Sequence, residues 1–121
     1  ITYTFTGDQI RNFYVDFYNS SDSNEYLYPI VDFTLNNIGN SISIENTTTG
    51  ETPFIFSGIS PNEHIIVDNS LKTIVSSTGL LRLNYFNKKW LRFIEGNNRI
   101  HVIAAIKELK LTYSFARKIG A

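Results

Sequence analysis

The segment Asn84–Trp90 carries the side chains best suited to contact a ligand or a partner. It places three aromatic residues, two asparagines and two lysines in seven consecutive positions, NYFNKKW. Sugar rings stack on aromatic faces and hydrogen-bond to neighbouring amide donors. The residues of this predicted contact are Tyr85, Asn87, Lys88, Lys89 and Trp90. Tyr26 and Tyr28 add further aromatic rings. The alternative is a hairpin in which Trp90 covers the core while the lysines stay in water.

Catalytic chemistry has little support. The two histidines, His64 and His101, are both flanked by strand-like residues, and no Gly-x-Ser-x-Gly motif accompanies the serines. The absence of cysteine excludes a cysteine nucleophile, a disulfide and a thiolate metal site. We therefore expect no catalytic residue, and we expect that the chain is not an enzyme.

Acidic side chains offer the remaining routes to chemistry. Two carboxylates at a suitable separation could hydrolyse a glycosidic bond. The candidates are Asp16, Asp32, Glu63, Asp68, Glu95 and Glu108. Their positions instead favour solvated strand faces and turns. His64 and Asp68 lie four positions apart, which is ~13 Å along a strand, so they cannot ligate one metal ion. Phosphate-binding glycine motifs are also absent, and we expect neither a metal nor a cofactor.

The overall composition excludes two classes of partner. Eleven basic residues balance eleven acidic ones in the 121-residue chain, so no net positive field attracts nucleic acid. The longest apolar runs, such as 102–106, are much shorter than the ~20 residues that span a bilayer. We expect no nucleic-acid partner and no membrane insertion.

The hydrophobic pattern predicts the elements that would hold any site. Apolar and polar residues alternate with a period of two, which is typical of strands with one buried face. The predicted strands cover residues 1–6, 13–18, 31–35, 41–45, 81–85, 99–102 and 109–115. Turn-forming clusters separate them at 19–24, 36–40, 46–50, 60–63, 68–70 and 76–79. This spacing predicts an all-β antiparallel sandwich that forms a single domain over residues 1–121.

Two segments need separate interpretation. Residues 104–109 could form a short helical turn or a bent strand. In the stretch that follows Trp90, Leu91 and Phe93 share one face. Gly96 and one of the asparagines Asn97 and Asn98 can take a positive φ. The stretch 96–98 is therefore predicted to be a structural turn rather than a ligand loop.

Several motifs occur in a fixed order along the chain. They are Tyr28-Pro29-Ile30, Ile42–Gly50, Ile66-Val67-Asp68, Trp90–Ile100 and Leu109–Tyr113. In this order the chain resembles the C-terminal domain of the siphophage distal tail protein family. That family's pattern includes a strand ending in Asn-x-Thr-x-Gly and a Gly-x-Asn turn before the penultimate strand. The chain departs from the pattern at Glu95, where the family usually has proline, and near Asn19, where a common glycine is absent.

The resemblance implies a galectin-like β-sandwich of the jelly-roll type at the C-terminus of a longer tail protein. The absence of methionine fits a piece of a longer product. An upstream domain would form a hexameric ring, and this domain would project outward to dock baseplate or receptor-binding proteins. The protein would be assembled in the bacterial cytoplasm and end in the virion tail. The alternative is a carbohydrate-binding module that recognises host cell-wall polysaccharide.

Overall fold

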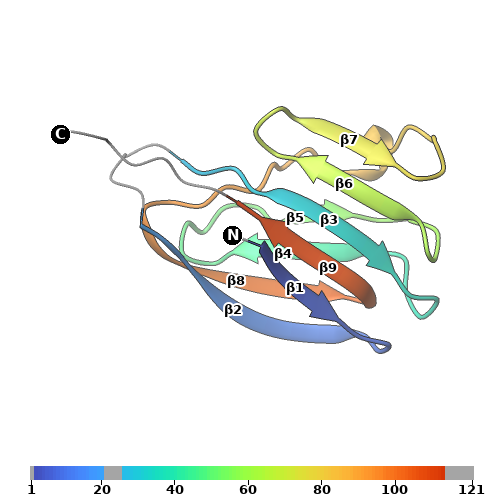
Figure 1. Ribbon diagram of the computed structural model, residues 1–121, viewed down its shortest axis with the longest axis horizontal. Coiled ribbons are helices and arrows are strands. Elements are labelled where there is room, and N and C mark those ends of the chain that lie inside the picture. Colours follow the sequence, from blue (N-terminus) through green and yellow to red (C-terminus); the bar gives the residue numbers. More distant parts are fainter. Residues whose placement is uncertain (1, 21–25, 114–121) are drawn as a thin grey trace.

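The computed structural model describes residues 2–20 and 26–113, which form two antiparallel sheets (Figure 1). Sheet A contains, in spatial order, β1 (Thr2–Thr6), β9 (Ile106–Thr112), β3 (Ile30–Leu35), β6 (His64–Asp68) and β7 (Thr73–Ser76). Sheet B contains, in spatial order, β2 (Arg11–Asn19), β8 (Gly96–Ala104), β4 (Ile42–Asn46) and β5 (Phe54–Phe56). The prediction of an all-β antiparallel sandwich is confirmed.

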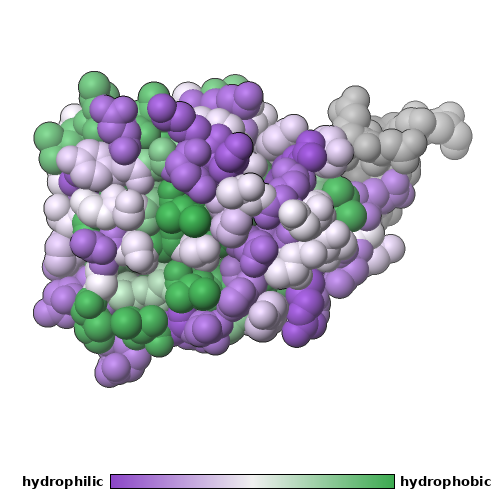
Figure 2. All heavy atoms as spheres, turned by 180° about the vertical axis from the view of Figure 1, so that it is seen from behind, coloured by the Kyte–Doolittle hydropathy of each residue, from purple (hydrophilic) through white to green (hydrophobic). Residues whose placement is uncertain are grey.

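Most of the predicted strands and turns are present. The alternation at 1–6, 13–18, 31–35, 41–45, 99–102 and 109–115 corresponds to β1, β2, β3, β4, β8 and β9. Residues 1, 114 and 115 of these predictions, and most of the predicted turn at 19–24, lie outside the described residues. Seen from behind, the surface mixes hydrophilic and hydrophobic residues, as expected for strands with only one buried face (Figure 2).

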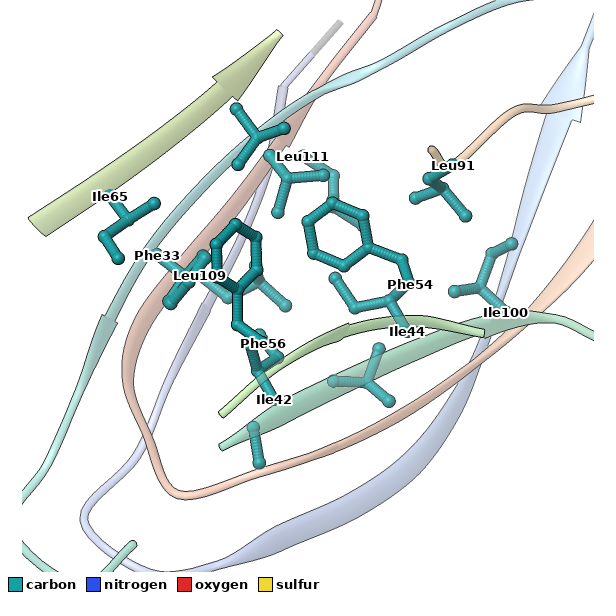
Figure 3. Close-up of a cluster of buried hydrophobic side chains, with 14 of the residues drawn as sticks. Phe33, Ile42, Ile44, Phe54, Phe56, Ile65, Leu91, Ile100, Leu109 and Leu111 are labelled. Atoms are coloured by element: carbon teal, nitrogen blue, oxygen red, sulfur yellow. The ribbon is translucent and has the colours of Figure 1, made fainter. Parts of the chain in front are cut away.

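The hydrophobic core lies between the two sheets. Phe33 of β3 pairs in register with Leu109 of β9, and both side chains point inward. The Phe33 ring packs against Phe56 of the opposite sheet, with centroids 5.4 Å apart. Figure 3 shows these side chains meeting those of Ile42 and Ile44 from sheet B. Removal of this apolar surface from water is the main stabilising term of the fold.

The segment 104–109 adopts the bent strand and not the helical turn. Strand β8 ends at Ala104 in sheet B, and β9 begins at Ile106 in sheet A. Buried Ala105 is the only residue between them. Its carbonyl oxygen accepts a hydrogen bond from the Asn36 amide at 2.8 Å. One small residue therefore carries the chain from one sheet to the other.

The prediction of a strand at 81–85 is wrong. Residues Leu83–Tyr85 form a short 3-10 helix, η1, and the expected burial is reversed: Leu81 is 90% exposed, whereas Arg82 is only 6% exposed. Alternation alone assigns a charged side chain to water. Here a buried carboxylate, Glu63, neutralises Arg82, so the cation lies inside and the leucine outside.

The prediction of a turn at 96–98 is wrong, because these three residues begin strand β8, and only the positive φ expected of Gly96 is confirmed. Gly96 has a φ of +88°, whereas among the described residues neither Asn97 nor Asn98 has a positive φ. Leu91 and Phe93 are both buried, as their spacing predicted. The backbone around them is not a regular strand, because within 2–20 and 26–113 its only strand-type pairing is an isolated bridge between Phe93 and Leu27. No helix in the described part of the chain is long and apolar enough to span a membrane.

Candidate functional site

The irregular segment between η1 and β8 is held by buried asparagines rather than by strand pairing. The Asn98 side chain accepts a hydrogen bond from the Ile94 amide at 2.8 Å and donates to the Ile94 carbonyl at 2.9 Å. Asn46 of β4 donates to the Arg92 carbonyl at 2.9 Å and to the Asn98 side chain at 3.0 Å. These bonds satisfy backbone groups that a strand ladder would otherwise pair.

A third asparagine fixes the same segment from the other sheet. Asn69, which follows β6, is 1% exposed and accepts a hydrogen bond from the Leu91 amide at 2.8 Å. Its side-chain nitrogen donates to the Pro29 carbonyl at 2.7 Å. The loops that surround residues 88–92 are therefore tied to both sheets and to each other.

A groove of about 570 Å³ opens where these loops meet. Its lining comes from separate parts of the chain: Tyr28, residues 50–52, Lys72, residues 88–90 and Arg92. Tyr28 is partly exposed, and Trp90 is half-buried, with its ring edge-on to buried Phe86 at a centroid distance of 4.9 Å. The groove therefore combines two aromatic side chains with four cationic ones. This volume is typical of sites that bind small molecules or short polymers.

The groove keeps most of its positive charge. Its one carboxylate, Glu51, accepts a hydrogen bond from Arg92 Nε at 2.6 Å, and this bond raises the pKa of Arg92. The Arg92 guanidinium also lies over the Tyr26 ring, 3.6 Å from its centroid. Lys72, Lys88 and Lys89 form no ion pair with a described residue. The groove therefore favours an anionic ligand.

The predicted contact residues fall into two groups. Lys88, Lys89 and Trp90 line the groove. Tyr85 does not; its ring lies under the Arg82 guanidinium, 4.6 Å from centroid to carbon, and close to Gly58. Asn87 accepts hydrogen bonds from the Ile55 and Lys89 amides and donates to the Pro53 carbonyl at 2.7 Å. Asn87 therefore shapes the loop that presents the lysines.

The family of the chain follows from a comparison with known sequences. The sequence model of a family described as "phage tail C-terminal domain" matches residues 2–113. The chain belongs to this family. No curated protein matches it, and neither does any solved structure. The resemblance to a phage tail C-terminal domain is thereby confirmed, and the tail domain is a structural component of the virion that contacts other tail proteins.

The two histidines and the carboxylates Glu63 and Asp68 of the tail domain contact neighbouring polar groups. His64 contacts Asp32 across β6 and β3, and His101 contacts Asn12 at 2.5 Å. Glu63 is buried and paired with Arg82. Asp68 accepts hydrogen bonds from the Ser70 and Leu71 amides at 2.9 and 3.1 Å, as a turn residue does. Among the described residues no group of three or more His, Asp or Glu side chains could hold a metal ion.

Sequence reasoning missed several residues of the groove. Lys72 and residues 50–52 come from loops far in sequence from the NYFNKKW segment, and only the folded chain brings them beside Trp90. Arg92 follows that segment by two positions and was not predicted as a contact residue. No local pattern identifies such a meeting. The one available signal was the aromatic ring of Tyr28, whose place beside Trp90 the sequence does not reveal.

Proposed function

We propose that the tail domain is the outward-facing C-terminal domain of a longer tail protein and docks baseplate or receptor-binding proteins at the tail tip. An upstream domain would form the hexameric ring, and assembly would take place in the bacterial cytoplasm before the protein joins the virion. In this role the domain is a galectin-like scaffold without catalysis. Membership in a phage tail family supports this reading.

A cluster of exposed apolar side chains, here termed the apolar corner, supports a docking role. Its members come from β6, β7, the turns at the two ends of β7 and the start of η1: Ile66, Leu71, Val75, Leu80, Leu81 and Leu83. Leu71 is 71% exposed and Val75 is 61% exposed. In Figure 2 hydrophobic residues are visible at the upper left, the corner of the molecule that contains β7 in Figure 1, and others lie at the centre and lower left. Exposed apolar patches of this kind mark protein contacts.

The strand at this corner is suited to the same purpose. Strand β7 is the last strand of sheet A, so one of its edges is not paired within the described residues. Ile66 and Val75 lie opposite each other in the β6–β7 register, and both are exposed. An unpaired edge offers backbone donors and acceptors to a second protein. A partner with an apolar surface and an extended segment would fit it.

The experiment replaces Val75 and Leu81 by lysine in the full-length tail protein of the phage or prophage that encodes it. Because both side chains are exposed, the domain should stay folded. We expect cryo-electron microscopy to show particles that lack their docked receptor-binding proteins. These particles should also adsorb poorly to the host. The matched control is Ile103→Lys on the outer face of sheet B, which should leave particles complete. A full set of docked proteins on the double variant would refute the proposal.

A second candidate function is binding of host cell-wall polysaccharide, which the groove favours because it brings Tyr28 and Trp90 together. Trp90 is the only tryptophan, so its fluorescence reports on the groove without labelling. A saturable change on titration with host cell-wall polysaccharide, lost in Tyr28→Ala and kept in Tyr85→Ala, would support it. No change, together with no heat in calorimetry, would remove it.

A further inference from the structure

We propose that the groove binds an acidic glycan: Trp90 and Tyr28 contact the sugar rings, and Lys72, Lys88 and Lys89 bind a phosphate or carboxylate on the same polymer. This inference rests on the second candidate function and adds the charge class of the ligand. It is separate from the docking role of the apolar corner.

The first argument is the local excess of charge. The whole chain carries equal numbers of basic and acidic residues, so composition does not force cations together. The groove nevertheless holds three exposed lysines and an arginine against one carboxylate, and that carboxylate is bound by Arg92. The Glu51–Arg92 pair thus leaves the three lysines with their charge unneutralised. An anionic ligand would complete the site.

The second argument is the backbone conformation of two of these lysines. Lys72 has a φ of 57° and Lys88 a φ of 62°. Side chains with a Cβ avoid this left-handed region, and where they adopt it glycine or asparagine is preferred. Among described non-glycine residues only Asn62 shares it. The backbone at these two positions would be less strained with glycine or asparagine. The presence of lysine at both, on one groove, indicates that the positive charge there has a role.

The third argument is that the lysines are presented by rigid turns. Asp68 holds the turn before Lys72 through the Ser70 and Leu71 amides at 2.9 and 3.1 Å. Asn87 holds the turn around Lys88 by accepting from the Lys89 amide at 3.2 Å. A site whose loops are fixed before binding loses less backbone entropy when the ligand arrives.

A glycan fits these features better than an acidic peptide does. The groove is lined by Tyr28 and Trp90, whose flat faces suit sugar rings, whereas the exposed apolar side chains that suit a protein belong to the apolar corner. Lysine ammonium groups act as point charges and bind phosphate without the planar geometry that arginine requires. An acidic sugar would therefore contact both the aromatic rings and the lysine side chains of the groove.

The test uses the whole chain and a double variant, Lys72→Asn/Lys88→Asn, which removes two charges while keeping side chains that tolerate a positive φ. The matched control is Lys107→Asn/Lys110→Asn, which removes two charges from β9. The probe is an array of bacterial surface glycans that contains neutral, uronic-acid and phosphate-bearing structures, followed by calorimetry on the strongest hits. A glutamate heptapeptide serves as the non-sugar anion.

We expect binding to be confined to acidic glycans, to weaken at least tenfold in the groove variant, and to stay unchanged in the β9 variant. Equal binding of neutral glycans would overturn the charge assignment while leaving polysaccharide binding intact. Equal binding of the glutamate peptide would overturn the glycan assignment. Binding of no glycan would overturn the inference and the second candidate function together, without bearing on docking at the apolar corner.

Discussion

Arg82 and Glu63 form a buried two-point ion pair between the chain after β7 and the loop before β6. Arg82 Nε lies 2.7 Å from Glu63 Oε2, and Arg82 Nη2 lies 2.6 Å from Glu63 Oε1. The two residues are 6% and 2% exposed. Ser76 Oγ donates to the same carboxylate at 2.5 Å, and the Ser60 amide donates at 3.3 Å. Both charges are thus satisfied, and the pair attaches the chain after β7 to the loop before β6.

Breaking this pair should be costly. Glu63→Gln leaves the Arg82 guanidinium buried without its counter-charge, and we expect a loss of about 3 kcal/mol in the free energy of unfolding. Urea denaturation of the wild type and of Glu63→Gln measures this difference in the free energy of unfolding. The double variant Glu63→Leu/Arg82→Leu, which removes both charges, should be closer to the wild type than Glu63→Gln is.

The exposed pair Arg99–Asp16, at 3.7 Å, supplies the control for this experiment. Because water already solvates both groups, Asp16→Asn should cost less than about 1 kcal/mol. Similar losses at Glu63 and Asp16 would contradict a special role for the buried pair.

Stability should depend on pH through Glu63. Its hydrogen bonds from Arg82 are the main cause that lowers the pKa of the carboxyl from 4.5 to about 2. Since the folded-state pKa lies below the unfolded one, this contribution is fully present above pH 4.5 and is lost as pH falls toward 2. The stability gap between wild type and Glu63→Gln, measured by urea denaturation, should therefore narrow from pH 6 to pH 2.5. A constant gap would show that the pKa is not lowered.

The buried asparagine at the start of β8 should matter more than its exposed neighbour. Asn98→Ala removes the partners of the Ile94 amide and carbonyl at once, and we expect a loss of at least about 2 kcal/mol. The exposed side chain of Asn97 donates one hydrogen bond, to Asp16 at 3.3 Å. Asn97→Ala should therefore change the free energy of unfolding by less than about 0.5 kcal/mol. Thermal unfolding compares the two. Equal effects would show that the Asn98 network does not hold the segment.

The sequence predicted those strands in which burial follows side-chain alternation. In β2 and β8 every second residue faces the core, so the period of two is visible without a structure. The prediction failed at 81–85 because the partner that makes Arg82 buriable, Glu63, lies 19 positions earlier. Local hydrophobicity cannot report a charge that is neutralised by a distant residue.

The candidate site was predictable only in its contiguous part. Lys88, Lys89 and Trp90 are adjacent, and their types suggested a surface contact before the fold was known. Lys72 reaches the same groove only because β6 and β7 turn back beside that segment. Its left-handed backbone conformation, which distinguishes it from an ordinary surface lysine, has no signature in the sequence.

Glycine at position 96 is required by the backbone and not by space. Gly96 has a φ of +88°, and an added Cβ would meet no atom within 4 Å. Gly96→Ala should therefore destabilise the domain by about 1 kcal/mol, purely because an L side chain disfavours this conformation. Gly96→Asn should cost less, since asparagine tolerates a positive φ better than alanine. The urea concentration at the midpoint of unfolding measures both effects, provided that the dependence of the free energy on urea stays constant. Equal stability of all three proteins would mean that position 96 relaxes to a negative φ, and the path of residues 90–99 would then depend on the hydrogen bonds of the buried asparagines Asn46, Asn69 and Asn98.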